Sequence, residues 1–412
     1  MGRYKFLSKE PEFAKLLVAN TINRFGDSVD VVAYMWLIYE LTGSAAWSAF
    51  IYAINKIPNV FLQPLLGGWV EKKEKKKIMF TVDIIRGFFV VFLILLYVAK
   101  ALDIRLLILL TFFTSVVESF RIPAGMSFFQ KVIRPDNYKS GMALNSGLNT
   151  LAELAGYFVS GVIIGRFGCI TAIGIDGVTF FLSAGIIFAI KVINEEVADK
   201  KNTNIFTEFK EGLAYIRKNV FIRNFTLMAM FVNAILVPIN TFLVPYIKEY
   251  MGGSSNLLSY LNICISVGIF LGAMNSPKIS DKLETNLSIV VGGMIVATAY
   301  VSLSLLPHIS IALLAKGICM FVTMLLGFGI GVINTVLKTQ IVSTIDNGYM
   351  SRVSAVFTGC VSAITPLSGW IFGLIVGYVP VAGIYLICGS ICVAIFGGIK
   401  LLNLNFGEEV YS

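Results

Sequence analysis

Eight charged side chains lie well inside segments that are mostly apolar and long enough to cross a lipid bilayer. Five are acids and three are bases, namely Asp27, Asp30, Glu118, Glu153 and Asp176, with Arg24, Lys56 and Arg121. A charge at the centre of a bilayer costs about 3 kcal/mol on insertion scales, so such residues normally face a partner or a wet cavity. Because the acids outnumber the bases, the excess carboxyls must bind protons for part of a cycle or meet a cationic ligand. This imbalance predicts reversible proton binding.

Arg24, Asp27 and Asp30 lie three residues apart and therefore share one face of a helix. Two interpretations are open for Asp27, which either forms a structural ion pair with Arg24 or takes part in proton coupling. Asp30 is expected to line a cavity, because an acid inside a membrane span usually faces the interior of the protein.

The acids of the later segments have different neighbours. Glu118 and Arg121 lie three residues apart and can form a pair of their own. Glu153 has no charged neighbour on its own segment, which favours it as a proton site. Asp176 is expected to make a structural hydrogen bond, and Lys56 to pair with an acid of the first or fourth segment. The predicted proton-coupling residues are Asp27, Asp30, Glu118, Arg121 and Glu153.

The elements that position these residues are twelve apolar segments. The 412-residue chain is 57% hydrophobic and only 14% charged, whereas soluble domains carry about 25% charged residues. A spanning helix needs about 20 mostly apolar residues, and runs this long and continuous exclude barrel strands. The segments are Phe13–Leu41, Ser48–Val70, Ile78–Val98, Leu106–Gln130, Met142–Ile164, Ile170–Ile190, Phe225–Ile247, Leu257–Met274, Leu287–Leu306, Ile311–Leu337, Val353–Val376 and Val381–Leu402. They predict an all-α polytopic membrane protein with twelve transmembrane helices.

A short, strongly basic loop, Gly67–Lys77, joins the second and third segments. Lys and Arg are retained on the cytoplasmic side of membrane proteins, so this loop predicts that both termini are cytoplasmic. The net charge of +9 is concentrated in loops on that side. This distribution favours contact with the lipid bilayer and argues against nucleic-acid binding.

The longest polar interval, Lys191–Asn224, divides the segments into six and six. It predicts an N-terminal bundle over residues 1–192, a cytoplasmic linker over residues 193–220 and a C-terminal bundle over residues 221–412. Within the linker, apolar residues recur at helical spacing among charged ones, at Ile205, Phe209, Leu213 and Ile216. An amphipathic helix of this kind either lies on the inner membrane face or packs on the ends of the bundles.

The basic loop and the segment count resemble those of the major facilitator superfamily of transporters. The loop is similar to the pattern G-x-x-x-D-[RK]-x-G-[RK]-[RK], which five residues match by type, with Glu for the usual Asp: Gly67, Glu71, Lys72, Lys75 and Lys76. Residues Ile175–Ala184 resemble the I-D-x-x-[ST]-F-x-x-S-A stretch of a bacterial branch containing macrolide efflux pumps and the enterobactin exporter. The resemblance implies two six-helix bundles around a central cavity, in the plasma membrane of a bacterium.

The resemblance also implies a gate at the inner face. In the superfamily a network of this kind locks the two bundles together in the outward-open state, and the alternative is positive-inside anchoring alone. The predicted gating residues are Gly67, Glu71, Lys72, Lys75, Lys76, Asp83 and Arg86. Candidates for lining the substrate cavity are Arg24, Tyr34, Lys56, Asn233, Asn240 and Asn334. Tyr34 also fits an aromatic belt at the external interface.

Several other functions lack the residues they need. No phosphate-binding G-x-x-x-x-G-K-[ST] occurs, and His308 is the only histidine, so neither an ATPase nor a multi-histidine metal site can be assembled. The glycines of Gly327–Gly331 follow no strand and predict close helix packing instead of a nucleotide loop. The chain is therefore expected to be no enzyme and to use a proton gradient as its energy source, without a cofactor or metal.

Together these features predict a monomeric secondary transporter that exports an amphipathic small molecule, such as a drug, an antibiotic or a siderophore-like metabolite, in exchange for protons. The excess of acids favours cationic or neutral cargo. Tyr157 stands where exporters of the superfamily often carry Pro, which leaves proton-coupled uptake open. The remaining alternative, a non-transporting membrane scaffold, would need no unpaired acids within the membrane.

Overall fold

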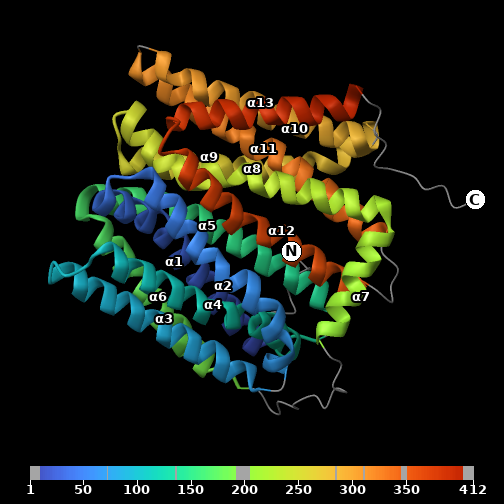
Figure 1. Cartoon of the computed structure of the whole chain (residues 1–412). Coiled ribbons are helices and arrows are strands. Elements are labelled where there is room, and N and C mark those ends of the chain that lie inside the picture. Colours follow the sequence, from blue (N-terminus) through green and yellow to red (C-terminus); the bar gives the residue numbers. More distant parts are fainter. Residues whose placement is uncertain are drawn as a thin grey trace, which may run out of the picture. The chain divides into compact units, whose positions relative to one another are not determined.

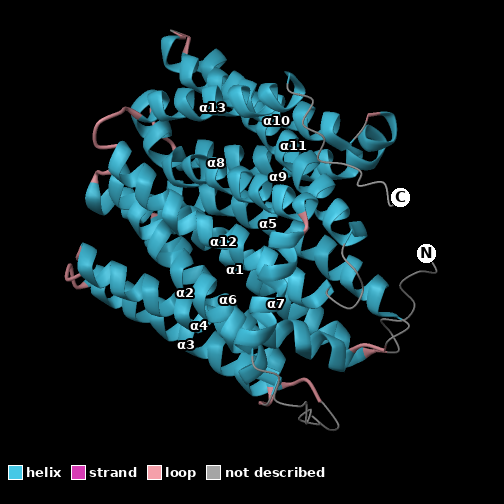
Figure 2. Ribbon diagram, turned by 45° about the vertical axis from the view of Figure 1, so that its right-hand side comes forward, coloured by secondary structure: helices cyan, strands magenta, loops and turns pink. Residues whose placement is uncertain are grey.

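The computed structural model describes residues 10–71, 73–134, 137–191, 205–283, 285–309, 311–344 and 350–401, and over these it consists of helices without a strand (Figures 1 and 2). The chain forms two compact units. The first comprises Met1–Gly43 and Ile54–Thr203, and the second comprises Ser44–Ala53 and Asn204–Ser412. The boundary near residue 203 lies within the linker that the sequence predicts.

Six long helices build the first unit. They are α1 (Pro11–Thr42), α2 (Ala45–Glu71), α3 (Lys75–Val98), α4 (Ile104–Val132), α5 (Tyr138–Phe167) and α6 (Cys169–Phe188). α1 packs against α6, α5 and α4, while α3 packs against α6 and α4. Figure 1 shows α3 and α6 side by side. The first residues of α2, Ser44–Ala53, group instead with the second unit.

The second unit contains the remaining helices. They are α7 (Ile205–Lys218), α8 (Val220–Tyr250), α9 (Ser255–Lys282), α10 (Thr285–Leu305), η3 (Leu306–His308), α11 (Ala312–Thr344), α12 (Met350–Ile375) and α13 (Val381–Leu401). The amphipathic linker helix is α7, which packs against α12 and α8 and buries Ile216. Of the two interpretations of this helix, the contact favours packing on a bundle over lying on the inner membrane face.

The twelve predicted segments coincide with α1–α6 and α8–α13. Among the described residues, ten of these helices are long and apolar enough to cross a membrane. Of the two helices not counted, α1 carries Arg24, Asp27 and Asp30, and part of α2 lies outside the described residues. The fold class is therefore the one that the sequence predicts.

Glycines allow the helices of each unit to approach closely. A Cβ atom on Gly26 of α1 would lie 1.9 Å from Oγ1 of Thr179 on α6. In the second unit, a Cβ on Gly272 of α9 would lie 2.1 Å from the carbonyl oxygen of Phe328 on α11, and one on Gly331 would meet α9 in the same way. Small residues at a helix crossing let the two backbones approach closely, because no bulky side chain separates them. The close packing predicted for Gly327–Gly331 is thus confirmed.

Candidate proton-coupling site

Arg86 of α3 is the central cation of the first unit. It is 7% exposed, and its Nη2 lies 3.0 Å from Oδ1 of Asp27 on α1. Its guanidinium also stacks over the ring of Phe180 on α6, 4.1 Å from the ring centroid. A buried guanidinium needs both a counter-ion and hydrogen-bond acceptors, because its charge is costly to remove from water. α1, α3 and α6 together supply this environment.

Three further carboxyls surround the same guanidinium. Arg86 interacts electrostatically with Asp30, Glu118 and Asp176 in addition to Asp27. Thr179 donates a hydrogen bond of 3.3 Å to Asp176, which is 2% exposed. Asp30 and Glu118 make no hydrogen bond or ion pair to any residue that the structure describes. Asp83, which pairs with Arg121, adds a fifth electrostatic contact, so carboxyls outnumber these two arginines among the described residues.

A cavity of about 70 Å³ lies inside the first unit, next to this cluster. Its polar wall is formed by seven residues of α1, α2, α3, α4 and α6: Asp30, Tyr34, Asn55, Arg86, Thr111, Thr114 and Asp176. Nε of Arg86 has no hydrogen-bond partner among the described residues. A cavity of roughly 10–15 Å³ is large enough for one water molecule when polar groups line it. The cavity is thus suited to water that contacts Asp30, Asp176 and Arg86.

Arg24 and Glu153 form a second ion pair, between α1 and α5. Nη2 of Arg24 lies 2.5 Å from Oε2 of Glu153, and Tyr157 donates a hydrogen bond of 3.1 Å to the other carboxylate oxygen. Gly156, beside Tyr157, allows the contact, because a Cβ there would lie 2.7 Å from the carbonyl oxygen of Phe25. The side chain of Arg24 is 44% exposed, so this pair is the more accessible of the two.

Arg121 of α4 forms a third ion pair, with Asp83 of α3. The contact is bidentate, with Nε–Oδ1 and Nη2–Oδ2 distances of 2.5 and 3.2 Å. Ser183 of α6 donates a further hydrogen bond of 2.7 Å to Asp83, which is fully buried. A planar guanidinium matches a carboxylate in this arrangement, which fixes orientation as well as charge. The pair ties α3, α4 and α6 together.

The pairs differ from those that sequence spacing suggests. Arg24 binds Glu153 and not Asp27, while Arg121 binds Asp83 and not Glu118. The three-residue spacing brings side chains to one helix face, but in a bundle a long arginine reaches the neighbouring helix. The prediction that Glu153 either has a partner on another helix or is neutral is resolved by Arg24. The structural hydrogen bond expected for Asp176 is present.

Asp83 and Arg86 lie apart from the basic loop, and their predicted gating role stays a prediction. The sequence groups them with the basic loop as part of an inner-face gate, whereas the structure buries both inside the first unit, each in an ion pair. Sequence reasoning also missed Ser183 and Tyr157. A signal existed for Tyr157, which lies four residues after Glu153 and so shares its helix face.

The remaining gating residues are only partly described. Lys76 donates a hydrogen bond of 2.8 Å to the carbonyl oxygen of Ile190, after the end of α6, and lies over the ring of Phe188. Lys75 is buried at 2% exposure and has interactions of its own. Lys72 and the side chains of Gly67 and Glu71 lie outside the described residues.

Lys15 binds the same end of α6. Its Nζ lies 2.9 Å from Glu12 and 3.2 Å from the carbonyl oxygen of Ala189. Glu12 in turn accepts a hydrogen bond of 2.6 Å from the backbone N–H of Lys191. The hydrogen bond from Lys15 holds the pKa of Glu12 below its ordinary value of 4.5. Cations near the last carbonyls of a helix are favourable, so this contact joins the start of α1 to the end of α6.

The candidates for the substrate cavity lie in both units. Tyr34 shares a hydrogen bond with Thr111 in the wall of the internal cavity, and its predicted roles stay predictions. Asn233 donates to the carbonyl oxygen of Ala229 on its own helix. Asn240 lies 3.5 Å from the hydroxyl of Tyr52, and Lys56 and Asn334 are half-buried.

Comparison with known proteins supports the same fold and class. The profile of the Major Facilitator Superfamily matches residues 16–369. A protein of Bacillus amyloliquefaciens named "Putative bacilysin exporter BacE" is 26% identical over 362 residues, 87% of this chain and 86% of the relative. The "Multidrug efflux pump Tap" of Mycobacterium bovis (strain BCG / Pasteur 1173P2) is 21% identical over 364 residues, 85% of this chain and 84% of the relative.

Solved structures share the fold at low sequence identity. The nucleoside transporter NupG superposes with a TM-score of 0.77 at 14% identity, over 96% of this chain and 99% of NupG. A bacterial homologue of the iron transporter ferroportin, in an inward-facing state, gives 0.73 at 12% identity, over 94% and 98% of the two chains. The family profile covers most of the chain, and the chain accordingly belongs to the Major Facilitator Superfamily of transporters, as a multi-span protein of the cell membrane.

Proposed function

We propose that this transporter exports an amphipathic small molecule in exchange for protons, with Asp30 as the residue that carries the proton. The main support for the proposal is the excess of carboxyls around one arginine. Arg86 interacts with Asp27, Asp30, Glu118 and Asp176. A transporter that must bind and release a proton in each cycle needs a carboxyl whose charge is not permanently neutralised by a partner.

Asp30 meets this requirement better than the other candidates. Asp27 has Arg86 as its partner, and Glu153 has both Arg24 and Tyr157. Asp30 has no direct partner among the described residues and borders a cavity large enough for water. A proton can therefore reach and leave Asp30 without the breaking of an ion pair.

The charge cluster suggests how the proton and Arg86 are linked. When Asp30 is protonated, Arg86 binds Asp27 alone, as in the observed arrangement. Loss of the proton adds an anion at Asp30 close to Arg86, which then attracts the guanidinium away from Asp27. Because Arg86 and Asp27 belong to different helices, α3 and α1, this exchange alters their contact. Such a change favours one state of the alternating-access cycle over the other. In this cycle the two bundles expose a site to each side of the membrane in turn.

The direction of transport and the cargo rest on the relatives and on charge. BacE and Tap are named as an exporter and an efflux pump, and both align over most of their length. The excess of acids favours neutral or cationic cargo over anionic cargo. We infer a monomer that draws on the proton gradient, without a cofactor and without catalysis of a reaction.

Proton-coupled uptake is the second candidate. Tyr157 favours it, because this residue stands in the place of a proline typical of exporters and binds Glu153. The experiment that separates the two uses purified protein in proteoliposomes with an imposed pH gradient and a panel of a macrolide, a tetracycline, ethidium and a siderophore. Cargo that moves against the proton flow supports export, and cargo that moves with it supports uptake. Flux that ignores the gradient for every compound would contradict proton coupling in either direction.

A further inference from the structure

A groove of about 500 Å³ runs between α3 and α4 on the surface of the first unit. Its floor is apolar and is formed by five residues of the two helices: Ile78, Val82, Ile85, Val117 and Phe120. Its rim lies at the start of α3 and carries Lys73, Glu74 and Lys77. The groove therefore has a charged end and an apolar length, which match the head group and the tail of an amphiphile.

The charge of the rim favours an anion. Among the rim residues that the structure describes, two lysines accompany one glutamate; Lys73 has contacts of its own, and Glu74 and Lys77 form an exposed ion pair of 2.9 Å. Exposed pairs of this kind contribute little energy, so Lys77 can exchange Glu74 for another anion at small cost. The start of α3 also adds the positive end of a helix dipole to the rim.

The length of the groove matches one leaflet of a bilayer. Lys75, the first residue of α3, and Ile85, the last floor residue along that helix, are separated by about 15 Å of helix rise. The hydrocarbon core of a bilayer is about 30 Å thick, so one leaflet spans about 15 Å. Beyond Ile85, exposed Phe88 and Phe92 continue the apolar surface of α3.

We propose that this groove binds one anionic phospholipid of the cytoplasmic leaflet. The phosphate contacts Lys73 and Lys77, and one acyl chain lies between α3 and α4 against Val82 and Phe120. Each of these two floor residues directly neighbours a member of the Asp83–Arg121 ion pair in the sequence. The lipid thus stabilises the helix pair that carries this buried contact.

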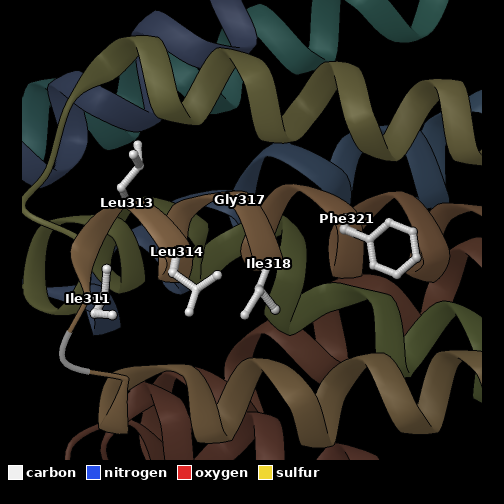
Figure 3. A pocket seen from close by; sticks show the side chains of 6 residues that line it. All are labelled: Ile311, Leu313, Leu314, Gly317, Ile318 and Phe321. Atoms are coloured by element: carbon white, nitrogen blue, oxygen red, sulfur yellow. The ribbon is translucent and has the colours of Figure 1, made fainter.

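A second hollow supplies a contrast within the same chain. Near the start of α11 a hollow of about 650 Å³ is lined by Ile311, Leu313, Leu314, Gly317, Ile318 and Phe321, and Figure 3 shows Leu314 and Ile318 projecting from the same side of the helix. All six residues are apolar, so lipid tails can cover this surface without a preference for any head group. Charge selectivity is expected at the α3–α4 groove and not at the α11 hollow.

Native mass spectrometry of the purified transporter, with phosphatidylglycerol and phosphatidylcholine as probes, tests the proposal. Wild type retains one phosphatidylglycerol in preference to phosphatidylcholine. The double variant Lys73→Gln/Lys77→Gln binds phosphatidylglycerol roughly 10- to 30-fold more weakly, since each lysine near a membrane surface contributes about 1 kcal/mol. The control Lys100→Gln/Arg105→Gln removes two exposed charges beyond the other end of α3 and leaves binding unchanged.

A second variant tests the place of the acyl chain without altering charge. Thr81 is an exposed residue of the groove, and Thr81→Trp fills the trough while both lysines remain. This variant loses the bound phosphatidylglycerol and keeps the wild-type melting temperature in detergent without added lipid. Retention of the lipid by Thr81→Trp, or an equal loss in the Lys100→Gln/Arg105→Gln control, would overturn the proposal. Equal retention of the two lipids by wild type would do the same.

Discussion

Arg86 and Asp27 meet at 3.0 Å across the boundary between α3 and α1, in a unit where Asp30, Glu118 and Asp176 share the same cation. The pair is shielded from solvent on the arginine side, where 9% of the side chain is exposed. A buried ion pair is costly to break from one side only, because the remaining charge is left without compensation. This relationship governs both the stability of the first unit and the proton chemistry proposed for it.

The variant Asp27→Asn is expected to destabilise the protein and to be partly rescued by a second change. Removal of the carboxylate weakens the hold on a buried guanidinium, and the loss of one partner of a buried pair costs roughly 3–5 kcal/mol. The double variant Asp27→Asn/Arg86→Gln removes both charges and should recover part of that loss. Thermal unfolding in detergent measures both. A double variant less stable than either single variant would show that Arg86 is anchored mainly by other groups.

Gly26→Ala is expected to disrupt the contact of α1 with α6. The new Cβ would lie 1.9 Å from Oγ1 of Thr179 and 2.5 Å from Oδ1 of Asp176, so the helices must separate. Overpacking of this kind costs about 1–3 kcal/mol. Gly185→Ala on α6 is the matched control, because no atom lies within 4 Å of its added methyl group. A fall in melting temperature confined to Gly26→Ala is the expected result, and equal melting temperatures would contradict the observed helix spacing.

Glu12→Gln is expected to lower stability near neutral pH and to have no effect in acid. The pKa of Glu12 is lowered, chiefly by the hydrogen bond from Lys15, so its stabilising contribution is present above the ordinary value of 4.5 and disappears as the pH falls below it. Melting temperatures of wild type and variant should therefore differ at pH 7 and converge as the pH falls from 4.5 through the lowered pKa of Glu12. A difference that persists unchanged in acid would assign the effect to something other than ionised Glu12.

The sequence predicts the helices well because apolar length is a local property. Each predicted segment lies on a helix of the structure, with ends that differ by a few residues, and the widest difference occurs at α9, where the polar residues after Met274 continue the helix as far as Lys282. Helix formation inside a bundle does not require each residue to be apolar, so hydropathy alone places such ends too early.

The pairing of the charges is not local and was therefore predicted less well. The spacing of Arg24 and Asp27 permits a pair on one helix, but Glu153 on α5 provides a closer partner. The sequence places Arg86 at the start of the third segment, as part of the inner-face network, and does not show that its side chain is buried beside Asp27. Only the packing of α1, α3, α4 and α6 reveals that Asp27, Asp30, Glu118 and Asp176 interact with this one arginine.

Glu153→Gln supplies the control for the central claim. This change removes the charge of a carboxyl that is already paired with Arg24 and hydrogen-bonded to Tyr157. If Glu153 serves to hold Arg24 and α5 in place, the variant loses transport rate but still responds to the pH gradient. Loss of the gradient response in Glu153→Gln, with a normal response in Asp30→Asn, would exchange the roles of the two residues.

Proton coupling through Asp30 is tested most simply by cargo-driven proton movement in proteoliposomes that contain a pH-sensitive dye. It compares wild type, Asp30→Asn and Glu153→Gln with the compound of the panel that wild type moves fastest. Asp30→Asn is expected to exchange cargo across the membrane at equal pH, but to move no protons and to respond no longer to a pH gradient. Proton movement by Asp30→Asn at the wild-type ratio to cargo would contradict this expectation.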